Sequence, residues 1–335
     1  MPPLPTAPAR DCFLWTCRAG FEGHLYEELA WAKAHPTLVG PALVASDAHP
    51  GLRPAFGRMG FGVLWSGTAF VAEAFARSLG QVGLPGPVFV QGWSVDDPVS
   101  LRRSQEAEAM AEAVARALPA AMRADSAECA REQNGTLAQV VAAGDALWIA
   151  GVVGAREAVS LSPGGRQRMR RGPASPSRAS MKLEEALRGL WLSPGRGDVC
   201  VDLGAAPGGW TGVLVARGAS VIAVDPARLR PELLRHPKVR HIRESAFAFE
   251  PEAPVDWLFC DMAWRPLEVA QLLAKWARRR WAVHLVANIK LPMKDKNPII
   301  LRVRRTLEDG GWQQLSVRQL YHDRDEVTVT ARRAR

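Results

Sequence analysis

The sequence predicts a chain of two parts. Residues 1–160 are expected to be an α+β region, and residues 181–335 a mostly parallel α/β domain whose sheet ends in an antiparallel hairpin. After residue 180, apolar segments of strand length alternate with helical segments, which is typical of βαβ units. Between the two parts, residues 161–180 are rich in Pro, Gly, Ser and Arg without apolar periodicity, which predicts a basic linker. A length of 335 residues also fits two domains.

Two strands and two helices are predicted in the N-terminal region. Residues 13–17 and 146–153 are short apolar runs of strand length. Apolar residues recur at helical spacing in residues 22–33, and residues 106–118 are rich in Ala, Glu and Arg, which favour helix. This pattern predicts helices packed on a modest sheet.

Seven strands are predicted in the C-terminal part, with helices between the first five. In chain order they cover residues 199–203, 221–224, 239–242, 257–260, 281–289, 313–320 and 327–331. The connection over residues 321–326 is too short for a crossover helix, so we expect the last two strands to pair antiparallel at one edge. Such a sheet is typical of S-adenosylmethionine (SAM) methyltransferases more than of NAD dehydrogenases.

A glycine-rich turn follows the first of these strands and leads into a helix predicted over residues 211–217. The turn reads Asp202-Leu203-Gly204-Ala205-Ala206-Pro207-Gly208-Gly209-Trp210. Open α/β sheets bind ligands at the carboxyl ends of their strands, where glycines let the backbone approach closely. Asp225 ends the next strand, where a carboxylate can accept hydrogen bonds from ribose hydroxyls. The dinucleotide pattern G-x-G-x-x-G is absent, which favours an adenosyl ligand without pyrophosphate and disfavours NAD-linked oxidoreduction.

Two lysines and two carboxylates are predicted to meet at this edge of the sheet. Lys290 ends the run WAVHLVANIK and Asp261 ends the run DWLFCD. Lys182 opens a helix predicted over residues 182–189, and Glu326 begins the last strand. A neutral lysine can be the general base for a weakly acidic hydroxyl when burial and a second cation lower its pKa. The four residues are therefore a candidate catalytic set.

The motifs around these residues resemble a known family. Residues 201–210 are similar to motif I of the FtsJ-like ribose 2′-O-methyltransferases, which carry a Lys-Asp-Lys-Glu catalytic set. The strings MKLEEA, NIKLPMK and RQLYHDRDEVTV resemble, more narrowly, the family of ribosomal RNA large subunit methyltransferase M, which methylates a cytidine 2′-hydroxyl in 23S rRNA. The resemblance covers most of residues 177–333.

This resemblance implies SAM as cofactor and 23S rRNA as substrate. It implies that Lys182, Asp261, Lys290 and Glu326 form the tetrad, with Lys290 as proton acceptor. Cofactor contacts are implied at Ser180, Asp202, Gly204, Ala206, Pro207, Gly208, Gly209, Trp210, Asp225, Ser245 and Asp261. Ser245 departs from the family, which often has an acidic residue near the adenine. Trp210 and Trp264 flank the motifs and are candidates for stacking on bases.

The N-terminal region resembles the family more weakly, through the string CRAGFE after its first strand. The resemblance implies a ferredoxin-like element and a THUMP-type RNA-binding domain. Residues 1–160 carry a net charge of −4 and residues 161–335 one of +13. A basic half favours a polyanionic partner, whereas an acidic region is poorly suited to phosphate contacts. A domain mainly for stability or assembly is therefore the alternative for this region.

Composition and motif content limit the cellular location, the cofactors and the partners that the sequence predicts. The sequence has five cysteines without a C-x-x-C pair and no metal-binding cluster, so we expect no metal. It has no secretion signal and no membrane-spanning run, so we expect a cytoplasmic protein without a membrane partner. No feature indicates an oligomeric state. Two other functions stay open: a 2′-O-methyltransferase of another RNA such as tRNA, and a non-catalytic RNA-binding factor in ribosome assembly.

Overall fold

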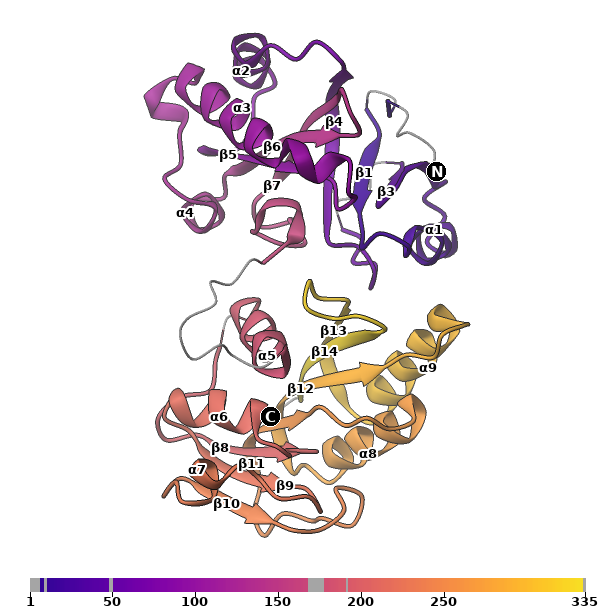
Figure 1. The fold of residues 1–335 in the computed structure, drawn as a ribbon, viewed down its shortest axis with the longest axis vertical. Coiled ribbons are helices and arrows are strands. Elements are labelled where there is room, and N and C mark those ends of the chain that lie inside the picture. Colours follow the sequence, from indigo (N-terminus) through magenta and orange to yellow (C-terminus); the bar gives the residue numbers. More distant parts are fainter. Residues whose placement is uncertain (1–6, 9–10, 48–50, 168–177, 191, 334–335) are drawn as a thin grey trace. The chain divides into compact units, whose positions relative to one another are not determined.

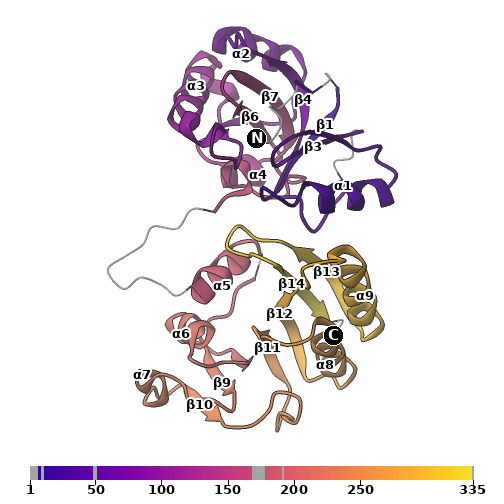
Figure 2. The same ribbon diagram turned by 45° about the vertical axis from the view of Figure 1, so that its right-hand side comes forward.

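The structure is a computed structural model that describes residues 7–8, 11–47, 51–167, 178–190 and 192–333. The chain divides into two compact units, Met1–Gln167 and Arg168–Arg335, and each contains one seven-stranded sheet (Figures 1 and 2). Residues 168–177 of the predicted basic linker lie outside the described residues. Within the rest of that segment, Pro163–Gly165 form a single 3-10 turn.

The N-terminal unit is a mixed sheet covered by helices. Its strands are β1 (Phe13–Thr16), β2 (Thr37–Gly40), β3 (Leu43–Ser46), β4 (Met59–Gly67), β5 (Val88–Ser94), β6 (Thr136–Ala143) and β7 (Leu147–Gly154). The helices are α1 (Glu22–Trp31), α2 (Ala72–Gln81), α3 (Ser104–Ala117) and α4 (Ala127–Glu132), with 3-10 turns at Ser100–Arg103 and Ala120–Met122. The strand order is β2-β3-β1-β4-β7-β6-β5. Helix α3 packs on β5 and β6 and against α2, and both helices contribute buried apolar residues to one cluster with the sheet.

The two strands and two helices predicted in this unit are present. The expectation of a modest sheet is wrong, because the sheet has seven strands. Every residue of β6 is buried, so this strand lacks the polar alternation that marks a half-exposed strand. The apolar pattern of strand β4 is interrupted by Gly60, where a Cβ atom would lie 2.5 Å from the Phe13 ring. Its glycine serves close packing on β1 and hides the strand pattern in the sequence.

The C-terminal unit is a three-layered α/β domain. Its strands are β8 (Val199–Leu203), β9 (Ser220–Val224), β10 (Val239–Ile242), β11 (Val255–Cys260), β12 (Ala282–Lys290), β13 (Trp312–Arg318) and β14 (Glu326–Arg333). Its helices are α5 (Arg178–Arg188), α6 (Gly209–Ala216), α7 (Pro231–Leu234), α8 (Pro266–Arg278) and α9 (Lys296–Asp309). Each predicted strand lies within two residues of an observed one.

The order of this sheet is β10-β9-β8-β11-β12-β14-β13. Strands β8 to β12 are parallel, and β14 pairs antiparallel with both β12 and β13, which confirms the hairpin predicted at one edge. Two expectations are wrong. No helix connects β10 to β11, where Pro251 and Pro254 interrupt a short connection. Helix α5 begins at Arg178, so Lys182 lies inside the helix and does not open it.

Strand direction determines where the functional side chains meet. The parallel strands β8, β9, β11 and β12 all end at the same edge of the sheet. Because β14 runs the opposite way, its first residue, Glu326, lies at that edge, directly across the ladder from Lys290. The residues singled out at strand ends are therefore neighbours in space.

Candidate active site

The glycine-rich turn forms a narrow backbone loop between β8 and α6. Gly204 has φ +75° and Gly208 φ +109°, both in the left-handed region that favours glycine. A Cβ atom on Gly204 would also lie 2.6 Å from Cγ of Met262. Asp225 stabilises the loop from the end of β9, because its carboxylate accepts hydrogen bonds from the backbone N–H groups of Ala206 (3.1 Å) and Ala227 (2.8 Å). The predicted binding loop and the predicted ribose-binding carboxylate are thus side by side.

Asp202 is directed into the core. Its side chain is 1% exposed and accepts a hydrogen bond from Oγ1 of Thr211 at 2.6 Å. Burial raises the pKa of this carboxyl to about 7, against the opposing effect of the Thr211 hydrogen bonds. Asp202 therefore links β8 to α6, and a direct contact with a cofactor stays a prediction.

The first turn of α5 packs against the start of α6. The indole N–H of Trp210 donates to the carbonyl oxygen of Ala179 (2.9 Å), and the Ser180 hydroxyl donates to that of Gly209 (3.2 Å). Trp210 is 3% exposed and packs edge-on against Phe259. The hypothesis that Trp210 stacks on bases is therefore wrong, because stacking requires an accessible ring face.

Two predicted positions lie at exposed sites. Ser245 is exposed, and its hydroxyl accepts a hydrogen bond from the backbone N–H of Phe247 at 3.3 Å. Trp264 is 52% exposed, and its indole N–H donates to Glu268 at 2.6 Å. Nothing in this arrangement excludes base stacking by Trp264, which stays a prediction.

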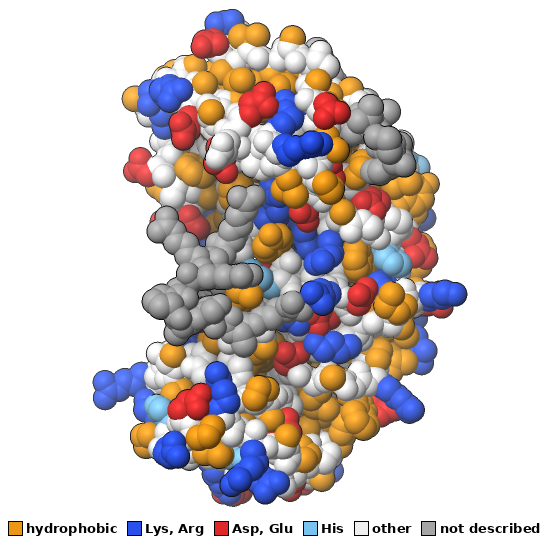
Figure 3. Space-filling model, viewed as in Figure 1, with side chains coloured by type: hydrophobic (Ala, Val, Ile, Leu, Met, Phe, Trp, Pro, Cys, Tyr) orange, Lys and Arg blue, Asp and Glu red, His pale blue; other side chains and the backbone are white. Residues whose placement is uncertain are grey.

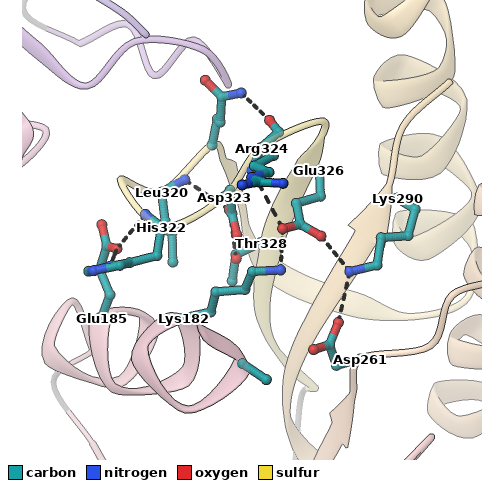
Figure 4. Close-up of polar contacts among 12 residues, drawn as sticks. Lys182, Glu185, Asp261, Lys290, Leu320, His322, Asp323, Arg324, Glu326 and Thr328 are labelled. Carbon is teal, nitrogen blue, oxygen red and sulfur yellow. Dashed lines mark hydrogen bonds and ion pairs between the residues drawn. The ribbon is translucent and has the colours of Figure 1, made fainter. Parts of the chain in front are cut away.

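The structure brings the four predicted catalytic residues together (Figure 4). Lys290 Nζ lies 3.1 Å from Oδ1 of Asp261. Glu326 bridges the two lysines, with Oε2 paired to Lys290 and Oε1 paired to Lys182. The side chains of Lys182 and Glu326 are each 7% exposed, whereas that of Lys290 is 33% exposed. Lys290 is therefore the member that a substrate can reach most readily.

The electrostatics of Lys290 differ from the sequence-based expectation. Burial alone lowers its pKa, but Asp261 and Glu326 outweigh burial, so the pKa of Lys290 is raised. The pKa of Glu326 is lowered, because its hydrogen bonds to Lys182 and Lys290 outweigh the effect of burial. Lys290 is thus protonated at neutral pH. The condition that burial and a second cation lower the pKa of Lys290 is therefore not met by the protein's own residues, since the carboxylates are its direct partners.

A further buried carboxyl lies behind the tetrad, and the sequence did not point to it. Asp323 is fully buried in the turn before β14, where its Oδ2 accepts hydrogen bonds from the Leu320 N–H (2.9 Å) and the Thr328 hydroxyl (3.0 Å). Burial, together with the nearby charge of Glu326, raises the pKa of Asp323 to about 8. The turn that leads into Glu326 therefore contains a buried titratable carboxyl in addition to the four residues of the tetrad.

The described parts of the chain contain neither a metal-binding cluster nor a membrane-spanning helix. No group of three or more His, Cys, Asp or Glu side chains in these parts of the chain could hold a metal ion. Over the same residues, no helix has the length and apolar composition of a membrane span.

The fold and the site together define a class of protein. A parallel sheet with an antiparallel pair at one edge, a glycine loop after its first strand and a carboxylate after its second make the C-terminal unit a Rossmann-like, SAM-dependent methyltransferase domain. Comparison with protein families agrees, because residues 176–287 match the FtsJ-like methyltransferases.

Curated relatives narrow this class. The chain is 42% identical over 192 residues to ribosomal RNA large subunit methyltransferase M of Xylella fastidiosa (strain M12), covering 54% of either protein. It is 44% identical over 174 residues to the protein of the same name from Halorhodospira halophila, covering 51% of either. The chain thus matches about half the length of these relatives. Residues 176–287 are thus similar to the FtsJ-like methyltransferases, and about half of the chain is similar to proteins named ribosomal RNA large subunit methyltransferase M.

Solved structures are more distant. Aeropyrum pernix fibrillarin, crystallised with natively bound SAM, aligns with a TM-score of 0.36 and 19% identity, over 58% of this chain and 82% of that chain. A likeness of this size carries no argument about the function of this chain.

Proposed function

We propose that this protein transfers a methyl group from SAM to the ribose 2′-hydroxyl of a cytidine in 23S rRNA. One observation carries the proposal: Lys182, Asp261, Lys290 and Glu326 converge at the edge of the sheet that also holds the glycine loop. Relatives that are 42–44% identical over about half the chain are named as large subunit ribosomal RNA methyltransferases, which supports the choice of rRNA.

The residues of the loop fit an adenosyl ligand. Between Gly204 and Gly209 the loop has no side chain larger than proline, so a ligand can approach its backbone. Asp225 uses one carboxylate oxygen for Ala206 and the other for Ala227, and each oxygen has a further lone pair for a ribose hydroxyl. SAM would supply an electrophilic methyl group on a positively charged sulfur.

The chain's own residues would handle the proton of the acceptor hydroxyl. Lys290 Nζ accepts this proton as the new oxygen–carbon bond forms and the sulfur–carbon bond breaks. Asp261 and Glu326 hold the Lys290 ammonium in the structure, so they fix its position and also stabilise its protonated form. Lys290 must therefore first release its own proton to solvent, to which its side chain is 33% exposed, and a nearby positive charge favours this release. The rate gain comes from alignment of the hydroxyl with the methyl group.

Charge and chemistry both favour RNA as the substrate. Only RNA has a 2′-hydroxyl acceptor. Lys and Arg side chains are spread over the face of the C-terminal unit shown in Figure 3, and residues 161–335 carry the basic excess. Such side chains bind a phosphate backbone without sequence preference.

The remaining parts of the assignment are also proposals. Residues 1–160 would be a THUMP-type RNA-binding region, 161–180 a basic linker and 181–335 the methyltransferase domain, acting in the cytoplasm. A 2′-O-methyltransferase of tRNA and a non-catalytic assembly factor are the competing functions. Retention of all four tetrad residues supports an enzyme over an assembly factor, since binding alone gives no chemical reason to keep them.

Tritiated methyl transfer from SAM tests the proposal. The purified protein is incubated with unmodified 23S rRNA or with tRNA, and the modified nucleotide is mapped. We expect label on a cytidine ribose of 23S rRNA only. Label on a base, or on tRNA alone, contradicts the proposal, and SAM binding without transfer to either RNA favours the assembly factor.

Two variants test the role of Lys290. Lys290→Ala and Lys290→Arg should abolish transfer while SAM affinity, measured by calorimetric titration, stays within twofold. Lys275→Ala is the matched control, because Lys275 lies on α8 and pairs with Glu250 away from the tetrad. Appreciable transfer by either Lys290 variant removes Lys290 from the role of base.

A further inference from the structure

The turn between β13 and β14 is internally braced. Asp323 accepts hydrogen bonds from the Leu320 N–H and the Thr328 hydroxyl, which lie on opposite sides of the turn. The Gln319 side chain donates to the carbonyl oxygen of Arg324 at 2.6 Å. Because these contacts cross the turn, a force on one side moves the whole turn, including the start of β14.

Glu185 of α5 holds this turn from outside (Figure 4). Its Oε1 accepts a hydrogen bond from the backbone N–H of Tyr321 at 2.8 Å. Its Oε2 accepts from the backbone N–H of His322 at 3.1 Å and is paired with Nδ1 of the same histidine at 2.7 Å. The Glu185 side chain is 7% exposed, so little water competes for these charge-assisted contacts.

Two side chains on one face of helix α5, those of Lys182 and Glu185, thus contact the β13–β14 hairpin. Lys182 and Glu185 are three residues apart and lie next to each other on the helix surface. Lys182 pairs with Glu326, and Glu185 binds the turn four residues earlier in the chain. The neighbouring Glu184 pairs instead with Arg217, the residue that follows α6, at 2.6 Å.

We propose that Glu185 is a positioning residue for methyl transfer: by holding Tyr321 and His322, it sets Glu326 between Lys182 and Lys290. This inference rests on the proposed function. Glu185 does not touch a reacting atom, and it acts through the turn and through Glu326. No residue of the tetrad can replace it, because the tetrad itself contacts only the far end of the turn.

The position of Glu326 controls the acidity of Lys290, which makes the inference measurable. Lys290 is faced by Asp261 from β11 and by Glu326 from β14, and Glu326 is faced by Lys182 from α5 and by Asp323 from its own turn. Glu326 and Asp261 together raise the pKa of Lys290. If the turn loosens, Glu326 moves away and the pKa of Lys290 falls. A purely structural defect would leave that pKa unchanged.

Glu185→Gln is the test variant and Glu184→Gln the matched control. Glutamine keeps the shape of glutamate but presents an NH2 group to N–H donors, so one of the three contacts is lost. We expect Glu185→Gln to lower the plateau rate of methyl transfer about tenfold, in the range of other misplacements near a reacting group. The acid limb of its rate–pH profile should move to lower pH. Glu184→Gln should match the wild type in both.

The acidity of Lys290 is followed independently of activity. The chain has seven lysines, so carbon-13 labelling at lysine Cε gives few NMR signals, and Lys290→Arg assigns the signal of Lys290. We expect a lower Lys290 pKa in Glu185→Gln than in the wild type or in Glu184→Gln. Equal pKa values overturn the inference, whether or not the rate falls.

The outcomes separate this inference from the proposed function. A wild type that transfers no methyl group to rRNA or tRNA refutes the proposed function, and the NMR titration still decides whether Glu185 sets Glu326 against Lys290. An active wild type with an unchanged Glu185→Gln profile refutes the positioning role alone. SAM affinity should be equal in all three proteins, because Glu185 lies away from the glycine loop.

Discussion

Replacement of Asp323 by asparagine should change how stability depends on pH. Burial raises the pKa of Asp323 to about 8, whereas an unfolded chain has a value of about 3.9. A group whose pKa is raised by folding contributes stability below the unfolded value and loses it as the pH rises through the folded value. The folded state therefore becomes less stable between about pH 4 and pH 8, where the carboxyl is ionised in the unfolded chain but still protonated in the folded protein.

The size of the effect follows from the same shift. From pH 6 to pH 9 the Asp323 contribution falls by about 3 kcal/mol, at about 1.4 kcal/mol for each pH unit up to the folded pKa. Asparagine keeps an acceptor for Leu320 and Thr328 but does not ionise. For a unit of this size, about 2–4 °C per kcal/mol gives a difference of roughly 6–12 °C between variant and wild type.

Thermal unfolding at pH 6 and pH 9, followed by circular dichroism, measures this difference. The melting temperature of the wild type should fall further between the two pH values than that of Asp323→Asn. Asp202 also titrates in this range, but it is present in both proteins and cancels. Equal slopes for Asp323→Asn and the wild type would refute the reasoning.

Three further changes test other contacts. Thr211→Val removes the hydroxyl that donates to buried Asp202, so we expect about 1–3 kcal/mol less stability in urea unfolding. Gly208→Ala places a Cβ atom at φ +109° and 2.1 Å from a methyl carbon of Leu233; it should cost about 1–3 kcal/mol and weaken SAM binding in calorimetric titration. Lys296→Met removes a buried ammonium that donates to two carbonyl oxygens of the loop after β12, at 2.7 and 3.1 Å. It should lower the melting temperature and speed proteolysis of that loop.

The sequence predicted the C-terminal sheet well because its strands are covered on both faces. Such strands form continuous apolar runs, and β8, which is buried over four of its five residues, was predicted with its observed bounds. Strands β2 and β3 of the other unit have four residues each and were not predicted. Their pairing with each other and with β1 is decided by contacts that the local sequence does not carry.

The candidate site was predictable in its residues and not in its electrostatics. Lys290 and Asp261 were identified because the ends of parallel strands must meet at one edge. The raised pKa of Lys290 depends on distances to Asp261 and Glu326, which no spacing in the sequence gives. Glu185 escaped notice for a similar reason, since its partners are 136 and 137 positions away.

The place of β14 in the sheet has a consequence for synthesis of the chain. Among the strands of this sheet β14 is translated after all the others, yet it lies between β12 and β13. Until the residues after 325 have been synthesised, β12 and β13 each have an edge whose backbone N–H and C=O groups are unpaired. Such unpaired edges can form incorrect strand pairs. Insertion of β14 closes the sheet and delivers Glu326 to both lysines in one step. A nascent chain stalled before this point would hold the glycine loop but no assembled tetrad.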